Sequence, residues 1–508
     1  MQSKYKTYFL KLSPKICNAT FPYFTHLTSY YKLMMLIFLL NIFGCKKLLE
    51  INAPVTSTNA ANVYNSDATA AAVLTGIYAK TSLSLRGDGL ASLSLFPALS
   101  ADELTLYGGS SNRQAEYIEY YLNSLNKSIA GGTDFSNSTY LTIFITNSAI
   151  EGLTQSTGLT PAVKQHLLGE AKFMRAFCYF YLVNLYGDVP LATGTDYTVN
   201  ALLPRTIKAK VYQQIIVDLK EAQELLTDGY VAADALTSAN DRLRPNKWAS
   251  TALLARVYLY TEDWANAEIQ ATKIINNSSL YNLNTLNNVF LNTSTETIWQ
   301  LQPVSNPGLI SNTQDAKLFV LPSTGPTTEY QYPVYLSNNV VTSFEPGDQR
   351  KINWVDSVVV NKDSLTTITY YYPYKYKVIA PNAPVTEYTV VLRLAEQYLI
   401  RAEARAQQGN ITGAASDLNV IRNRAGLLNT TESTKPGLLT TILHERQVEL
   451  FTEWGHRWLD LKRSNIVDTV MSKVTPQKGG IWNSNWQWYP FILSDLLSDP
   501  NLVQNPGY

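Results

Sequence analysis

Two helix–turn–helix patterns constrain the fold of this chain more than any other feature. In residues 246–275, small and large apolar side chains interlock over two predicted helices joined near 262–263, and residues 391–426 repeat this arrangement around 409–410. The interlock is typical of tetratricopeptide-type helix pairs. Such pairs cannot bury their apolar faces singly, so several must stack. The sequence therefore predicts a mainly α fold, a tetratricopeptide-like right-handed scaffold of helical repeats.

One long stretch between the two pairs lacks helical periodicity. Residues 281–390 are rich in Asn, Thr, Pro and Tyr and contain short alternating pieces typical of strands. We expect an irregular insertion of loops and short strands here, and such loops on a rigid frame often carry binding residues. Further helices are predicted over residues 67–83, 139–154, 161–186 and 206–226.

The head of the chain contains an apolar run, residues 33–43, followed by Gly44 and Cys45. A membrane-spanning helix needs roughly 20 apolar residues, whereas the apolar core of a secretion signal needs about 7 to 15. A small residue before a cysteine is where bacterial lipoproteins are cut and lipidated, so we expect lipidation of Cys45. Phe43 is bulky for its position, and the leader is long. A plain signal peptide with a chance cysteine, or a buried segment, is the alternative.

The predicted organisation is a removable head followed by one domain. The head is a signal peptide over residues 1–44, and a lipidated cysteine with its tether follows over 45–62. The domain spans 63–508, with helical repeats over about 63–280 and 391–465, the insertion over about 281–390, and a C-terminal segment, 466–508, that packs back.

Charge gives no reason to expect nucleic acid as a partner. The chain has 41 Lys and Arg against 40 Asp and Glu, a formal net charge of +1. This balance provides no electrostatic footprint for nucleic acid, so neutral ligands fit better. Of the three cysteines, Cys17 and Cys45 lie in the head, and Cys178 is flanked by aromatics. We expect Cys178 to pack as a small hydrophobe.

The most enzyme-like stretch is residues 444–463, in which acidic residues stand four apart. A glycosidase needs two acids on opposite sides of a bound sugar, and neighbours on one helix face cannot easily take those places. Basic residues of the same stretch are plausible partners. We interpret the acids as part of a structural ion-pair network, and we include an arginine within the apolar stripe of residues 161–186. The predicted network is Arg175, Glu445, Arg446, Glu449, Glu453, Arg457, Asp460 and Arg463.

Other chemical signatures are missing from the sequence. The four histidines form no HExxH pair, and no CxxC, GxSxG, P-loop or dinucleotide fingerprint occurs. We therefore predict no catalytic residue, no metal ligand and no cofactor, and we expect the protein not to be an enzyme.

Four segments, taken in order, resemble the SusD/RagB family of Bacteroidetes outer-membrane lipoproteins. They are "GEAKFMRAFCYFYLVNLYGDVPL", "VLRLAEQYLIRAEA", "ERQVELFTEWGHRWLDLKR" and the closing "QNPGY". The stretch "YPFILSDLLSDP" departs from the family's Pro-Ile-Pro-like turn. The resemblance implies a surface lipoprotein that binds an oligosaccharide, or in some members a peptide, and delivers it to a SusC-like TonB-dependent transporter. A lipid-anchored hydrolase is the third possibility.

The resemblance does not identify ligand residues, because the family's binding loops vary. Sugar recognition needs an aromatic platform beside amide or guanidinium donors, and two segments supply that mixture. Ordinary loop packing is the competing interpretation of each residue. The candidates are Tyr107, Asn112, Arg113, Tyr117, Tyr330, Tyr332, Tyr335, Arg350 and Trp354. By contrast, we assign to the core the aromatics on helical stripes, Trp248, Tyr258, Trp264, Trp454 and Trp458.

Overall fold

The computed structural model describes residues 60–83, 93–126, 135–304, 312–363 and 365–508. The predicted signal peptide, Cys45 and the tether up to residue 59 lie outside the described residues, so they stay predictions. In the described part of the chain, no helix is both long and apolar enough to cross a membrane.

The core is built around helix α7 (Pro161–Tyr186). Every side chain of this helix from Phe173 to Tyr186 is buried, so the single apolar stripe predicted here is too narrow. The reason is that helices pack on several sides of α7, including α6 (Phe135–Gln155) and α9 (Lys208–Leu225). The helix ends at Gly187, whose φ of +77° is accessible to glycine at little cost.

The two predicted helix pairs are present and stack on each other. The first is α10 (Lys247–Tyr260) with α11 (Trp264–Ile275), and the second is α15 (Leu394–Gln407) with α16 (Ile411–Arg424). Asn246, Asp263 and Asn410 cap three of these helices by accepting hydrogen bonds from backbone N–H groups of the first turn. Helix α11 packs against α15, so the pairs meet in space although the insertion separates them in sequence. The prediction of a helical-repeat fold is confirmed.

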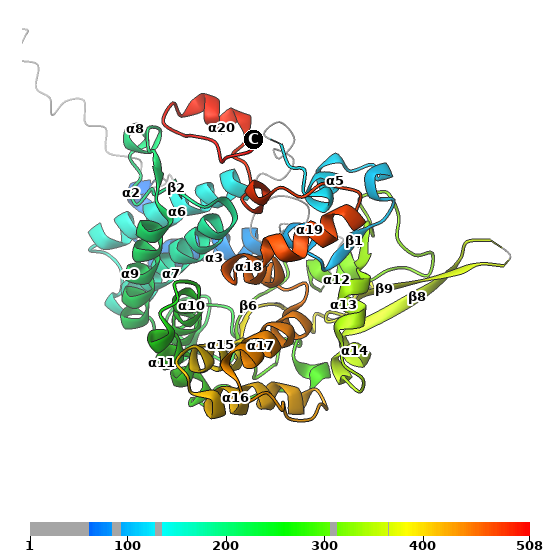
Figure 1. Cartoon of the computed structure of the whole chain (residues 1–508). Helices are drawn as coiled ribbons and strands as arrows, with labels where there is room; N and C mark the ends of the chain where they lie inside the picture. The colour runs from blue at the N-terminus through cyan, green and yellow to red at the C-terminus, as the bar shows by residue number, and fades with distance from the viewer. Residues whose placement is uncertain (1–59, 84–92, 127–134, 305–311, 364) are drawn as a thin grey trace, which may run out of the picture. The chain divides into compact units, whose positions relative to one another are not determined.

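The insertion contributes short strands that form one local hairpin and two pairings between segments far apart in the sequence. Each sheet of the described residues has two strands. Strand β6 (Thr297–Leu301) pairs with β10 (Thr389–Arg393), β1 (Leu104–Leu106) with β7 (Val334–Leu336), and β8 (Val355–Asn361) with β9 (Thr367–Pro373), all antiparallel. The β8–β9 hairpin extends away from the helices at the right of Figure 1.

The other elements complete the helical frame and its edges (Figure 1). Near the C-terminus, the Asn505 amide donates to the backbone oxygens of Tyr186 and Tyr489, which fixes the last residues on the end of α7. The remaining helices are α2 (Ala60–Val63), α3 (Asp67–Leu83), α4 (Phe96–Ser100), α5 (Ala115–Leu122), α8 (Tyr197–Asn200), α12 (Gln314–Phe319), α13 (Asn338–Ser343), α14 (Gln349–Trp354), α17 (Lys435–Leu450), α18 (His456–Arg463), α19 (Val467–Gln477) and α20 (Leu493–Ser498). The short 3₁₀ helices are η3 (Gly109–Ser111), η5 (Leu286–Asn288) and η6 (Ser484–Gln487), and the remaining strands are β2 (Val189–Pro190), β3 (Arg205–Thr206), β4 (Tyr230–Val231) and β5 (Ser238–Ala239).

Candidate functional site

Pairing of β1 with β7 brings the two predicted ligand-binding segments together. Thr105 lies opposite Tyr335 in this ladder, and the Tyr107 N–H donates to the backbone oxygen of Pro333 at 2.8 Å. Residues directly opposite each other in an antiparallel pair share a face, and so do residues two apart along one strand. Thr105, Tyr107 and Tyr335 therefore lie on one face of the β1–β7 ribbon.

Tyrosine rings gather on this face. The ring of Tyr370, from β9, meets the ring of Tyr335 edge-on at 5.0 Å between centroids and the ring of Tyr107 at 5.9 Å. Tyr121, from α5, lines the same space. We call these four residues, Tyr107, Tyr121, Tyr335 and Tyr370, the tyrosine cluster. Offset and edge-on geometries are the favoured arrangements for aromatic pairs, so the cluster is a stable platform.

An open cavity of about 400 Å³ lies against the tyrosine cluster. Its walls come from β1, α5, β7, β9, α13 and α19, so segments from most of the chain's length build it. We call it the tyrosine cavity. Its volume is that of a small-ligand site, and it combines aromatic faces with hydroxyl and amide groups. The uncharged polar side chains in its wall are Thr105, Ser337, Asn338, Asn339, Thr369 and Gln477.

The tyrosine hydroxyls of the cavity stay protonated near neutral pH. Burial, and then the neighbouring hydroxyls of Tyr121, Tyr370 and Tyr107, raises the pKa of Tyr335 to about 12. Burial also raises the pKa of Tyr370 and of Tyr121. A protonated hydroxyl can both donate and accept a hydrogen bond. Tyr121, Tyr335 and Tyr370 therefore offer neutral groups that suit the hydroxyls of a sugar.

Arg113 and Tyr330 lie in adjoining loops outside the cavity wall. The Arg113 guanidinium forms an exposed ion pair with Glu329, and its backbone N–H donates to the oxygen of Thr328 at 3.3 Å. Tyr330 is 45% exposed. Tyr332, in the same loop, has a φ of +59°, an uncommon conformation for a residue other than glycine. Backbone strain of this kind concentrates at ligand-binding segments.

Two other candidates, Asn112 in the first loop and Tyr117 on α5, have a clear structural role. Asn112 is buried; its amide donates to the backbone oxygen of Tyr107 at 2.8 Å, and its side-chain oxygen accepts from the N–H of Gln114 at 2.9 Å. Tyr117 is fully buried, with its ring 6.4 Å from that of Tyr330. The Asn112 side chain shapes the loop that carries Tyr107 and Arg113. Tyr117 lies on α5, where a surface ligand cannot reach it.

The prediction that Arg350 and Trp354 bind ligand is wrong. Both side chains are fully buried. Arg350 donates to Asp348, Glu445 and Glu449 at 2.6–3.0 Å, and the Trp354 indole donates to the backbone oxygen of Leu286. A guanidinium beside an aromatic ring can be either a surface sugar site or an interior ion-pair site, and the sequence pattern does not distinguish them.

The acids of residues 444–463 lie at the centre of a buried ion-pair network. Glu449, with no exposed side-chain surface, accepts from Arg350 at 3.0 Å, from Arg393 at 2.6 Å and from Arg424. Burial alone would raise the pKa of Glu449, but the guanidiniums of Arg424, Arg393 and Arg350 hold it well below its usual range. Glu449 is therefore a charged carboxylate that no substrate can reach.

Two details of this network differ from the prediction. Helix α17 ends at Leu450, so Glu453 lies in the connection to α18 and not on the same helix as Glu445. The cations that pair with the three glutamates come from other elements and not from residues 446–463. Glu445 pairs with Arg350 and Arg422, and Glu453 pairs with Arg393 and Lys375.

The other predicted network residues are also ion-paired. Arg446 and Arg463 share Asp460, at 2.8 and 2.7 Å. Arg463 also pairs with Glu403, Arg457 with Asp102 and Arg175 with Asp218. Among the aromatics assigned to the core, Tyr258, Trp454 and Trp458 are buried. Trp248 and Trp264 are partly buried and pack against the core.

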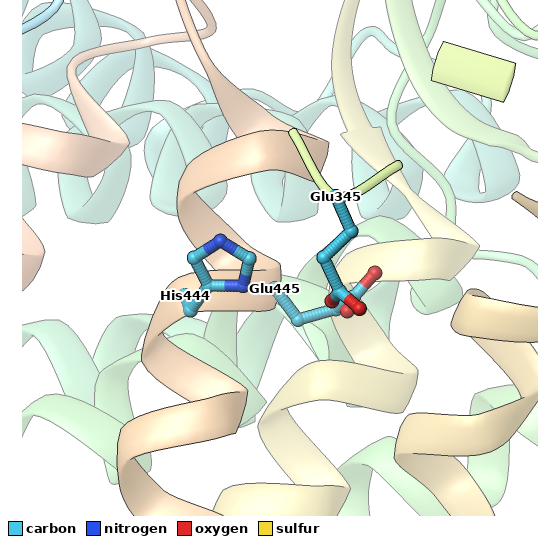
Figure 2. A group of neighbouring side chains, drawn as sticks. All are labelled: Glu345, His444 and Glu445. Atoms are coloured by element: carbon cyan, nitrogen blue, oxygen red, sulfur yellow. The ribbon is translucent and has the colours of Figure 1, made fainter. Parts of the chain in front are cut away.

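One group of side chains has the composition of a metal site (Figure 2). Glu345, His444 and Glu445 each offer one ligand atom, all within 4.8 Å of one another. However, Glu345 accepts two hydrogen bonds from Arg422, at 2.6 and 3.0 Å, and Glu445 accepts from Arg350 at 2.6 Å. The charge of both carboxylates is thus already balanced. A cation here would compete with two guanidiniums.

Sequence reasoning missed several residues of the tyrosine cavity. Tyr370 lies in the alternating piece "ITYYYPYKYKV", where strand periodicity could have placed every second tyrosine on one face. Tyr121 lies one turn after Tyr117 on α5. Asn338, Asn339 and Gln477 give no such signal, because they meet the cavity only through long-range packing.

Comparisons with known proteins agree with this architecture. Residues 329–508 match a family model described as "SusD family", and residues 98–259 match one described as "Starch-binding associating with outer membrane". The chain is 27% identical to the SusD-like protein P2 of Formosa agariphila, over 94% of this chain and 99% of that protein. It is 25% identical to the starch-binding protein SusD of Bacteroides thetaiotaomicron, over 70% and 75% of the two chains.

Solved structures show the same fold. A SusD superfamily protein from Bacteroides vulgatus superposes with a TM-score of 0.73 at 19% identity, covering 88% of this chain and all of that one. A laminarin-binding SusD-like protein superposes with a TM-score of 0.70 at 23% identity, covering 86% and 99%. With two family models matching separate parts of the chain, and relatives aligned over most of its length, this protein belongs to the SusD/RagB family of Bacteroidetes.

Proposed function

We propose that this protein binds an extracellular oligosaccharide in the tyrosine cavity and delivers it to a SusC-like TonB-dependent transporter in the outer membrane. The observation that carries the proposal is the cavity itself. Two segments chosen from sequence for their sugar-binding composition meet there through β1 and β7. Family membership supports glycan binding, because the family includes a starch-binding protein and a laminarin-binding one.

The protein binds without breaking a bond. A glycosidase needs two carboxyl groups that flank the scissile bond of a bound sugar. The carboxylate of the cavity wall, Asp102, is held by Arg457. The three glutamates of the enzyme-like stretch lie inside the ion-pair network, where Glu445 and Glu449 have no exposed side-chain surface. The hydrolase alternative therefore has no support from the geometry.

Anchoring depends on Cys45, which lies outside the described residues. Replacing Cys45 with alanine is expected to abolish incorporation of labelled palmitate and to release the protein from the outer membrane, since the acyl chains supply the anchor. Metabolic labelling followed by membrane fractionation measures both effects. Cys17→Ala is the matched control, because that cysteine precedes the predicted cleavage site and its loss should change neither readout. If the Cys45→Ala variant incorporated as much labelled palmitate as the wild type, lipidation at this residue would be refuted.

Sugar binding depends on the tyrosine cluster. We expect Tyr370→Ala to weaken binding by about tenfold or more, the loss that corresponds to 1.4 kcal/mol of aromatic contact. Isothermal titration calorimetry with the best-binding members of a glycan panel, laminarin included, measures the change. Tyr371→Ala is the control, because adjacent residues on β9 face opposite sides and Tyr371 is 37% exposed.

The same titrations separate the proposed ligand from a peptide. Unchanged glycan affinity in Tyr370→Ala, with an unchanged melting temperature, would exclude the tyrosine cavity as the sugar site. Binding of peptides but no glycan, lost on Tyr370→Ala, would replace the oligosaccharide by a peptide ligand. Copurification of a TonB-dependent barrel with the lipidated protein, from its native membrane, tests the delivery step.

A further inference from the structure

The charged groups of the tyrosine cavity are already bound to partners within the protein. Two side chains in its wall, Asp102 and Lys478, can carry a charge. The other wall residues are aromatic, aliphatic, hydroxyl or amide side chains. How these two groups are held decides what kind of ligand the cavity accepts.

Asp102 is neutralised by an arginine behind the wall. Its two oxygens accept from Nε and Nη2 of Arg457, both at 2.8 Å, in a bidentate pair. Asp102 is 4% exposed. Burial alone would raise the pKa of Asp102, but Arg457 lowers it. The carboxylate is therefore charged, and both of its oxygens are paired with Arg457. Arg457 cannot serve a ligand without leaving this carboxylate unpaired.

The Lys478 ammonium binds backbone oxygens at the end of a helix. Its ammonium donates to the backbone oxygens of Leu99 at 2.7 Å, Ser100 at 3.2 Å and Ala101, at the C-terminus of α4. An ammonium has three N–H donors, so this arrangement uses all of them. The ring of Tyr121 also lies 5.3 Å from the ammonium nitrogen. Burial lowers the pKa of Lys478 to about 7, which further weakens it as a ligand for anions.

Outside the wall, Arg113 is held less tightly. Its ion pair with Glu329 is solvent-exposed, with 71% and 55% of the two side chains accessible. Exposed pairs contribute little because solvent screens them, so Glu329 does not hold Arg113 firmly. Yet the pair is neutral as a whole, and Arg113 is not part of the cavity wall. It does not provide a cation inside the site.

We infer that the tyrosine cavity selects uncharged glycans over glycans that carry uronate or sulfate groups. An anionic group buried against this wall would find no free cation among the described residues that line it, and would have to displace Asp102 from Arg457 or three carbonyls from Lys478. Leaving a charge unpaired at a partly buried site is strongly unfavourable. The hydroxyls of a neutral sugar meet complementary groups at once, because the wall offers amide and hydroxyl donors and acceptors beside the tyrosine rings.

This inference rests on the proposed function and is tested with the full-length mature protein. A panel of neutral polysaccharides, including laminarin and starch, is compared by calorimetry with uronate-bearing alginate and sulfated carrageenan, at one ionic strength. We expect the best neutral glycan to bind at least about tenfold more tightly than any anionic one. Gln477→Lys places a new cation in the wall and should raise the affinity for the anionic glycans.

Lys473 provides the control for the Gln477→Lys variant. It precedes Gln477 by one turn of α19 and lies outside the cavity wall, so Lys473→Gln should leave the ranking of glycan affinities unchanged. Tightest binding of an anionic glycan, lost on Tyr370→Ala, would overturn the inference and leave the proposed function standing. No binding of any glycan by the wild-type protein would overturn both. A Gln477→Lys variant with wild-type stability and no gain for anions would also contradict the role assigned to the wall.

Discussion

Replacing Glu449 with alanine is expected to lower the free energy of unfolding by about 3–5 kcal/mol, the cost of breaking a buried ion pair from one side. The side chain is fully buried and accepts from Arg350, Arg393 and Arg424. Its removal leaves three guanidiniums facing each other without their shared carboxylate. Arg350 still pairs with Asp348 and Glu445, and Arg393 and Arg424 still share Glu296, so the cost is the loss of the central carboxylate and not of every partner. Chemical denaturation of wild type and variant measures the loss.

A surface pair provides the control for this prediction. Asp228 pairs with Lys247 at 3.2 Å, with 69% and 41% of the two side chains exposed. Asp228→Ala should cost about 1 kcal/mol or less, because solvent screens the pair. A similar small cost for Glu449→Ala would show that the network contributes little to stability. Hydrolysis of a glycan by the wild type that is lost in Glu449→Gln, with stability unchanged, would revive the hydrolase hypothesis.

The helical frame is predictable from sequence because its signals are local. The interlocked alanines of 246–275 and 391–426, and caps such as Asn246, act within a few residues. The observed bounds of α10, α11, α15 and α16 fall inside those two stretches. Helix α7 shows where local pattern becomes insufficient. A helix buried on all sides has no single apolar stripe, so its periodicity underestimates its burial.

The ion-pair partners could not be predicted, because an ion pair does not require a particular spacing of its residues in the sequence. Glu449 could pair with any arginine of suitable reach, and the stretch 444–463 offers its own basic residues. The structure instead uses Arg350, Arg393 and Arg424, which α14, β10 and α16 bring to one point. The same ambiguity made Arg350 look like a ligand donor. Burial is a property of the tertiary fold and cannot be read from an isolated Arg and its aromatic neighbours.

The residue types of the candidate site could be predicted from the sequence, but the contacts that bring these residues together could not. Aromatic and amide residues after residue 103 and in the central insertion are visible in the sequence. Thr105 pairs with Tyr335, and the Tyr370 ring contacts both segments. These contacts join residues far apart in the chain, so the sequence does not show them. Short strands with no hairpin turn between them carry no register signal. Gln477, from α19, is the clearest example, because it lines the cavity although it is far in sequence from both predicted segments.

The second large effect concerns a buried acid beside the tyrosine cavity. Glu103→Gln is expected to stabilise the protein at pH 8 and to leave its stability nearly unchanged at pH 4.5. Glu103 is 1% exposed, and its carboxyl accepts from the N–H of Thr452 at 3.1 Å. Burial, and then the neighbouring carboxylate of Asp102, raises the pKa of Glu103 from 4.5 to about 8. The fold therefore holds this carboxyl in its neutral form near pH 7.

The sign of the effect follows from comparing the two states. Below pH 4.5 the carboxyl of Glu103 is protonated in both the folded and the unfolded chain, so ionisation contributes nothing to stability. Between pH 4.5 and 8 the unfolded chain releases the proton and the folded chain keeps it, so stability falls as pH rises, and above pH 8 the loss is complete. Each unit of pKa difference corresponds to about 1.4 kcal/mol, so the full loss is on the order of 3–5 kcal/mol.

Glutamine removes this loss, because it does not ionise and its amide oxygen can still accept from Thr452. Urea denaturation of both proteins at pH 4.5 and pH 8 measures the change. The difference between them should be close to zero at the lower pH and on the order of 3 kcal/mol in favour of the variant at the higher one. Asp315 and Glu119, whose pKa values burial also raises, to about 7 each, titrate in both proteins, so they cancel in the comparison. A difference that does not grow with pH would mean that Glu103 is already ionised in the folded protein, and that Thr452, Arg457 and Lys375 stabilise its charge against burial.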